Sequence, residues 1–144
     1  MQRKLMVVLA AVVLVFVAIQ LAPVERSNPP VVADFDGPPE VKTVLKESCY
    51  DCHSHEVRWP WYSRVAPASW LVAHDVEEAR EHLNFSAWGT YDAKKRAKMI
   101  EDVWEEVEDG EMPLGKYLLL HSDARLTDQD RAILKRWATA EAGD

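Results

Sequence analysis

The sequence predicts an all-α protein, with one small helical domain behind an apolar N-terminal helix. A long apolar run lies near the start of the chain, and four later segments repeat apolar residues at helical spacing. No stretch of useful length alternates apolar and polar residues as a half-buried strand does. A chain of 144 residues has room for one modest domain, and it contains no internal repeat.

The N-terminal segment, residues 1–22, has the composition of a membrane anchor. Arg3 and Lys4 precede an apolar run that only Gln20 interrupts, and its length is borderline between a signal-peptide core and a spanning helix. Positive charge on the short N-terminal side places that side in the cytoplasm, so we expect the rest of the chain to be exported. Because Pro23 would directly follow a poorly formed cleavage site, we favour an uncleaved signal anchor over a removed signal peptide.

A Pro-rich linker is expected between this anchor and the domain. Residues 23–39 hold five of the eight prolines in the chain and have no sustained period. Extended chain of this composition would lift a domain clear of the lipid headgroups. We therefore assign residues 40–144 to the globular domain, which begins near Pro38.

Within the domain, four segments have the apolar spacing of amphipathic helices. They lie at about residues 40–48, 68–83, 92–109 and 127–140. The third segment is the clearest, because Gly110 is placed as its C-terminal cap. Thr127 and Asp130 give the last segment a start that is similar to a capping box.

Composition excludes several classes of protein. The formal net charge is −7 and the basic run at 94–96 is short, so the chain lacks the basic face of a nucleic-acid-binding protein. Both cysteines lie in one motif. This excludes a disulfide scaffold and leaves no second cysteine pair for a four-ligand zinc site.

That motif is Cys49-Tyr50-Asp51-Cys52-His53, the C-x-x-C-H pattern of c-type haem attachment. The spacing has a chemical reason. Two thiols add to the two vinyl groups on one edge of the porphyrin, and the histidine directly after the second thiol binds the iron from below the ring. The motif therefore predicts one covalently attached haem, held by Cys49 and Cys52, with His53 as an iron ligand.

Three other interpretations of the cysteines are weaker. A thioredoxin-like redox pair needs a βαβ frame that this sequence lacks. A zinc site from the motif and His55 would crowd four ligands into seven residues, which is too little chain to wrap a tetrahedron. A disulfide between the two cysteines would close a very small loop and stabilise the fold little.

From residue 40 to 137 the sequence resembles the haem-binding domain family of small bacterial exported proteins with one C-x-x-C-H. The resemblance lies in residues 49–55, 59–63 (Trp-Pro-Trp-Tyr-Ser), 66–67 with Trp70, 83–86 with Trp88, 111–113 and the Asn-Pro-Pro of 28–30. It implies covalent haem binding. Together with the N-terminal anchor, this predicts a haem domain at the outer face of a bacterial cytoplasmic membrane, in the periplasm or outside the cell. Family membership says little about the physiological partner.

For the second axial ligand we choose Met112. It lies far enough beyond the motif for the chain to pass around a haem, on an irregular segment between Gly110 and Pro113 that can aim its sulfur. The Gly-x-Met-Pro arrangement before a Trp-containing terminal helix also resembles Met-ligated single-haem cytochromes c. The middle of the chain departs from that family, which leaves the path from His53 to Met112 open.

The sequence offers several other candidate ligands. His121, which follows three leucines, is the credible rival of Met112. His55 is too close to His53 to reach the opposite face of the ring. His74 and His82 project away from an apolar stripe and are expected at the surface, and Met99 lies beside a stripe and is expected in the core.

The segment from Trp59 to Trp70 is rich in aromatic residues and proline. We expect this segment to fill the small core as a rigid loop. The functional alternative is that it forms a wall at the haem edge and excludes water from it. Arg58 or Arg64 is a candidate partner of a haem propionate, although each is more simply a solvated surface arginine.

A buried haem with two protein ligands has no open position for substrate, so we expect outer-sphere electron transfer and no enzymatic activity. The acidic balance favours a redox partner with a basic docking face, and the acidic residues of 101–109 are a candidate contact, although a solvated helix face is the simpler explanation. Two alternatives stay open. One is a five-coordinate haem that senses a small gas, and the other is an accessory haem subunit of a respiratory or peroxidase system.

Overall fold

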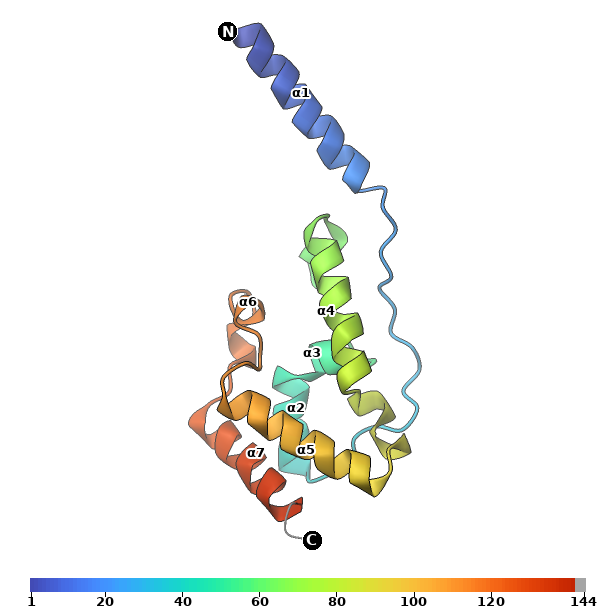
Figure 1. Cartoon of the computed structure of the whole chain (residues 1–144), viewed down its shortest axis with the longest axis vertical. Coiled ribbons are helices and arrows are strands. Elements are labelled where there is room, and N and C mark those ends of the chain that lie inside the picture. The colour runs from blue at the N-terminus through green and yellow to red at the C-terminus, as the bar shows by residue number, and fades with distance from the viewer. Residues whose placement is uncertain (142–144) are drawn as a thin grey trace.

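The computed structural model describes residues 1–141, which form helices joined by turns and loops and include no strand (Figure 1). The all-α prediction is therefore confirmed. The elements in chain order are α1 (Gln2–Ile19), α2 (Pro39–Ser48), α3 (Tyr50–His53), η1 (Trp61–Arg64), α4 (Ala68–His82), η2 (Phe85–Thr90), α5 (Ala93–Glu108), α6 (Gly115–Leu118), η3 (Ser122–Ala124) and α7 (Asp128–Glu141).

Helix α1 stands apart from the rest of the chain (Figure 1). It has 18 residues, none of them buried, and it is long and apolar enough to cross a membrane. A helix of this length spans roughly 27 Å at 1.5 Å per residue, close to the thickness of a bilayer core. A signal sequence has the same properties, so length and composition leave the choice between the two open.

The four helices predicted in the domain are present as α2, α4, α5 and α7, with ends within two residues of the predicted ones. Helix α5 begins where the side chain of Asp92 accepts a hydrogen bond from the Lys95 amide at 2.8 Å. It ends at Gly110, whose φ of +78° is in the left-handed region. The next amide, that of Glu111, then donates to the Glu106 carbonyl at 3.0 Å, which closes the helix as predicted.

The conformation of Gly110 allows a stability prediction. Replacing Gly110 by alanine is expected to lower the free energy of unfolding by about 1 kcal/mol, because a Cβ disfavours positive φ. Denaturant unfolding measures it. Gly115→Ala is the matched control, because Gly115 has open space around its Cα and no positive φ, and its effect should stay within about 0.5 kcal/mol. Equal effects at the two glycines would contradict the explanation.

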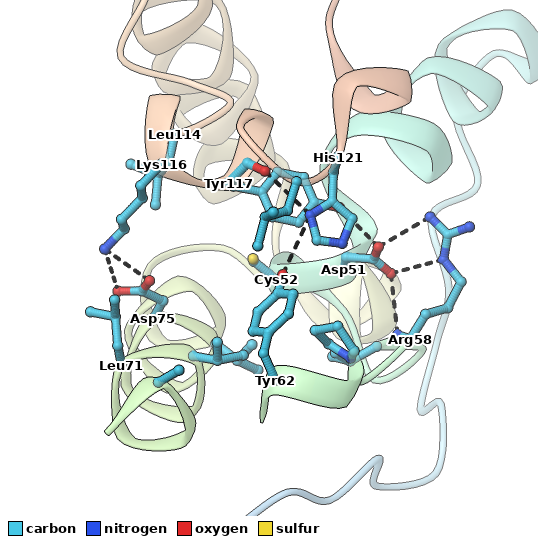
Figure 2. Close-up of a pocket in the computed structure, with 16 residues that line it drawn as sticks. Asp51, Cys52, Arg58, Tyr62, Leu71, Asp75, Leu114, Lys116, Tyr117 and His121 are labelled. Carbon is cyan, nitrogen blue, oxygen red and sulfur yellow. Dashed lines mark hydrogen bonds and ion pairs between the residues drawn. The ribbon is translucent and has the colours of Figure 1, made fainter. Parts of the chain in front are cut away.

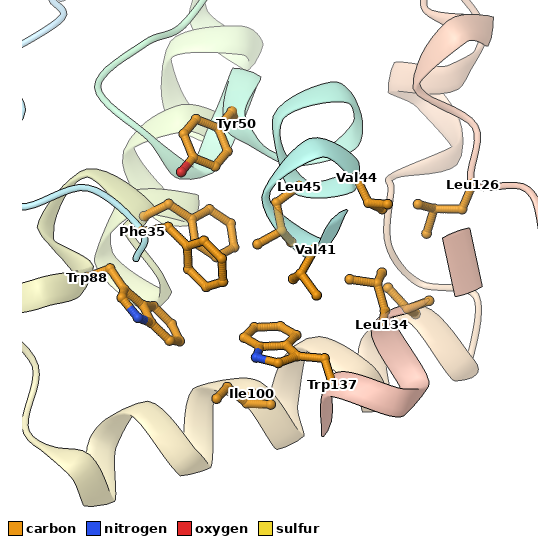
Figure 3. Close-up of a cluster of buried hydrophobic side chains, with 12 residues drawn as sticks. Phe35, Val41, Val44, Leu45, Tyr50, Trp88, Ile100, Leu126, Leu134 and Trp137 are labelled. Atoms are coloured by element: carbon orange, nitrogen blue, oxygen red, sulfur yellow. The ribbon is translucent and has the colours of Figure 1, made fainter. Parts of the chain in front are cut away.

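Helices α2, α5 and α7 pack around the hydrophobic core (Figure 3). Its buried members are Phe35, Val41, Val44, Leu45, Tyr50, Phe85, Trp88, Ile100, Val107, Leu126, Leu134 and Trp137. Each of the three helices contributes the apolar face that its spacing predicts. The other members come from segments without helical period, and they bring most of the aromatic rings.

The segment predicted as a free linker differs from the structure in its second half, residues 26–37, which we call the strap. Phe35 in the strap is only 1% exposed. Its ring lies 5.2 Å from that of Trp88, 5.5 Å from that of Trp137 and 6.0 Å from that of Phe85, centroid to centroid. The domain therefore begins well before Pro38, and Phe35 is one of its central core residues.

Polar contacts also hold the strap against the domain. The amides of Val32 and Ala33 both donate to the Ser86 carbonyl at 3.0 Å. The carboxylate of Asp34 accepts from the Tyr50 hydroxyl at 2.8 Å. Partial burial acts to raise the pKa of Asp34, but hydrogen bonds from Lys42 and Tyr50 outweigh it and hold that pKa below its usual value. The strap is thus fixed by backbone pairing, by an ion pair and by its aromatic anchor.

Candidate functional site

The C-x-x-C-H motif lies at the junction of two helices. Helix α2 ends at Ser48, Cys49 leaves helical geometry with φ of −124°, and α3 resumes with the rest of the motif. The amides of Cys52 and His53 donate to the Cys49 carbonyl at 3.1 and 2.9 Å. One helical turn therefore separates the two cysteines, which brings their side chains to the same face. Both thiols are free.

Both thiols are protonated at neutral pH. Burial, together with the charge of the neighbouring cysteine, raises the pKa of Cys49 to about 12. Burial and the nearby carboxylate of Asp51 raise the pKa of Cys52 to about 11. Reactive redox cysteines have a lowered pKa, so these surroundings argue against a thioredoxin-like redox pair. Within residues 1–141, no group of three or more His, Cys, Asp or Glu side chains is arranged to hold a metal ion.

His53 is oriented by the last turn of α4. Its Nδ1 lies 3.0 Å from the Ala79 carbonyl and 3.1 Å from the Leu83 carbonyl. Carbonyls only accept hydrogen bonds, so Nδ1 carries the proton and the lone pair is on Nε2. Burial lowers the pKa of His53 despite these two bonds, which keeps the ring neutral. A neutral ring fixed through one nitrogen is the usual state of a histidine metal ligand.

A cleft of about 220 Å³ opens beside the motif (Figure 2). The Cys52 side chain is on its wall, together with groups from α4, η1 and α6. Most of the wall is apolar, and its aliphatic members are Val57, Leu71, Val72, Val76, Leu114 and Leu120. Beyond the cleft the apolar surface continues, because Leu119 and Leu120 are 82% and 68% exposed.

His121 also lies on the wall of this cleft. Its Nδ1 is 3.2 Å from the Tyr117 carbonyl, so the proton is on Nδ1 and Nε2 has its lone pair free. The Tyr117 ring stacks on the imidazole at 4.2 Å between centroids, with 10° between the planes. The Tyr62 hydroxyl approaches from the other side of the cleft, 3.5 Å from Nδ1. His121 is therefore fixed in the same manner as His53.

Met112 lies outside this group of residues. Its amide donates to the Glu106 carbonyl at 3.0 Å as part of the α5 terminus, and its side chain is half-buried. The chain enters the cleft wall only afterwards, at Leu114. Between the two ligands considered from sequence, the structure brings His121 to the cleft beside Cys52 and does not bring Met112 there. The assignment of Met112 as axial ligand stays a prediction.

A hydrogen-bond network around Asp51 joins the motif to the His121 segment. The Tyr117 hydroxyl donates to Asp51 Oδ2 at 2.9 Å, and Arg58 donates to both carboxylate oxygens at 3.1 Å. Lys116 bridges from the same segment to Asp75 of α4 at 2.9 Å (Figure 2). Sequence reasoning missed this role of Asp51, because its partners are distant in sequence and no local pattern connects them.

The other candidate ligands have structural or surface roles. His55 has both ring nitrogens engaged, one 2.9 Å from the Pro30 carbonyl and the other accepting from Asn84 at 2.8 Å, so it is a structural residue. His74 and His82 are exposed, and Met99 packs against the core, as predicted.

The aromatic segment from Trp59 to Trp70 differs from the prediction that it fills the core. Trp61 is 77% exposed and Trp70 is 40% exposed. Pro60 and Tyr62 do line the cleft, so the functional alternative, a wall beside the haem, fits those two residues. Arg58 also lines the cleft, whereas Arg64 is exposed and lies outside its wall.

These residues fit a haem. The site offers two thiols on one face, a histidine oriented through Nδ1, and an apolar cleft whose wall holds Cys52 and the second oriented histidine, His121, while Cys49 and His53 lie behind that wall. Among the described residues, the buried indole nitrogen of Trp59 has no hydrogen-bond partner.

Comparison with known proteins identifies a family for this chain. No curated protein and no solved structure matches the chain. A family model described as a haem-binding domain matches residues 14–140, which include the strap as well as the helices that form the cleft. The match covers most of the sequence, and the chain therefore belongs to the haem-binding domain family.

Proposed function

We propose that this protein is a membrane-tethered c-type cytochrome that transfers electrons by an outer-sphere route. It carries one haem, bound through thioethers from Cys49 and Cys52, with His53 as an iron ligand. The observation that supports this most directly is the oriented His53, which is fixed through Nδ1 and directly follows Cys52, a free thiol on the wall of an apolar cleft. In each thioether bond the sulfur joins one vinyl carbon and the thiol hydrogen moves to the other, with no net oxidation.

His121 is our preferred second ligand. It lies on the wall of the cleft with Nε2 free, and the Asp51–Tyr117 hydrogen bond fixes its segment to the motif. Two histidines that both bind the iron would leave no open position for a substrate, which favours electron transfer over catalysis or gas sensing. The protein is therefore proposed to be a carrier without enzymatic activity. Two histidines would also give a lower reduction potential than the Met112 alternative.

The proposed location is the outer face of the cytoplasmic membrane, with α1 as the anchor. The proposed partner is a redox protein with a basic face. The acidic side chains of α5 that support this are exposed, namely Glu101, Glu105, Glu106, Glu108 and the following Asp109. Opposite charges of this kind would steer encounter and make electron exchange faster at low salt.

Optical spectroscopy of two ligand variants tests the axial assignment. The full chain is produced in a host with cytochrome c maturation, beside His121→Ala and Met112→Ala, with His74→Ala as an exposed control. We expect His121→Ala to convert the oxidised haem from low spin to high spin, and added imidazole to restore the low-spin spectrum. Met112→Ala and His74→Ala should retain the wild-type spectrum.

Two other spectroscopic outcomes would contradict His121 as the second ligand. A sulfur-to-iron charge-transfer band in the wild type that vanishes in Met112→Ala would replace His121 by Met112 as the ligand. A wild-type haem that is high spin and binds carbon monoxide rapidly would instead favour the five-coordinate sensor.

A further inference from the structure

An exposed apolar surface lies at one end of the domain, on residues 61–71, which we call the tip. Its exposed members are Trp61, Val65, Trp70 and Leu71, with 77%, 37%, 40% and 50% of their surface accessible. The tip comprises η1 and the first turn of α4. Of these four residues only Leu71 lines the cleft, so a haem would leave the two tryptophans and Val65 uncovered. Two exposed tryptophans on one short segment favour a surface that a partner covers.

The tip is attached to the end of α1. The Gln20 side chain, one residue after α1, accepts from the Ala66 amide at 2.8 Å and donates to the Ala66 carbonyl at 3.2 Å. Further on, Arg26 donates to the Ser63 carbonyl at 2.8 Å. The tip therefore lies directly below the C-terminal end of α1 (Figure 1). Where the apolar helix leaves the membrane, the tip is the nearest part of the domain.

We propose that the tip inserts into the headgroup layer of the outer leaflet, so that the domain lies against the bilayer in one orientation. The proposal rests on α1 spanning the membrane, as proposed above. Tryptophan favours this layer, because its ring is apolar while its indole N–H still finds water or a headgroup oxygen. Arg64, exposed in the same segment, supplies a cation for lipid phosphates. The occupant of this surface is thus the lipid into which α1 inserts.

Nuclear magnetic resonance of the tryptophan indoles tests the insertion. The full haem-loaded chain is placed in phosphatidylcholine–phosphatidylglycerol nanodiscs, with ¹⁵N in the six indoles, which single Trp→Phe variants assign. Peak intensities are compared between unlabelled lipid and lipid with a headgroup-level nitroxide. Trp88 and Trp137, 3% and 6% exposed in the core, serve as internal controls.

We expect the nitroxide to remove most of the intensity of the Trp61 and Trp70 signals and to leave those of Trp88 and Trp137 nearly unchanged. A water-soluble gadolinium chelate should then broaden Trp61 less in nanodiscs than in detergent. If the lipid nitroxide leaves Trp61 and Trp70 intact while the chelate broadens them fully, the tip faces water and the proposal is wrong. Co-elution with nanodiscs reports the anchor separately, and neither readout depends on electron transfer.

Discussion

Replacing Cys49 and Cys52 together by serine is expected to abolish haem that survives denaturation. The two thiols are the only cysteines in the chain, so no other side chain can form a thioether with a vinyl group. Either single replacement should retain one bond and reduce the yield of holoprotein. Intact-mass spectrometry and haem staining of denaturing gels, both on protein from a host with cytochrome c maturation, measure the effect.

Glu47→Ser is the matched control for this prediction, because Glu47 is exposed and precedes the motif in α2. It should retain the full mass of one haem. A double cysteine variant that keeps haem after denaturation would contradict thioether attachment. A wild type that loses its haem under the same conditions would show that the family's haem is bound here without a covalent bond.

The second large effect is expected at Phe35. Replacing Phe35 by alanine should lower the free energy of unfolding by about 3–5 kcal/mol, because its ring is fully buried among Trp88, Trp137 and Phe85. This is a large fraction of the stability of a small domain. Denaturant unfolding of the holoprotein in detergent, followed by far-ultraviolet circular dichroism, provides the measurement.

Val32→Ala separates the role of Phe35 from that of the strap as a whole. Val32 lies three residues earlier and is 68% exposed, so its truncation should change the free energy of unfolding by no more than about 0.5 kcal/mol. Similar small effects at both positions would mean that the strap is a loosely attached linker after all.

The contrast between α5 and the strap explains how far the fold could be predicted from sequence. Helix α5 has an apolar face at helical spacing and a glycine after its end, and both signals are local. Phe35 stands alone among Pro, Gly and Asp, with no period around it. Its burial depends on η2 and α7, which are distant in sequence, so no local pattern shows that the strap belongs to the core.

The candidate site shows the same contrast between residues with a local sequence pattern and residues placed by long-range contacts. The roles predicted for Cys49, Cys52 and His53 come from a local pattern, because the chemistry of haem attachment fixes their spacing within five residues. The second ligand depends on the path of the chain between α5 and α7. Met112 has the favourable local context, yet the Tyr117–Asp51 hydrogen bond brings the His121 segment to the cleft.

The attachment of the strap also determines how the protein can meet its partners. A free linker of residues 23–39 could extend to on the order of 60 Å, enough for a haem domain to swing between neighbouring complexes. Here the contacts of Gln20, Arg26 and Phe35 hold this segment against the domain, so it does not extend as a free linker. In the proposed role, the haem domain would therefore stay close to its membrane anchor and could not reach distant partners by swinging. Electron delivery would then be governed by lateral diffusion in the plane of the membrane and by the density of partners there.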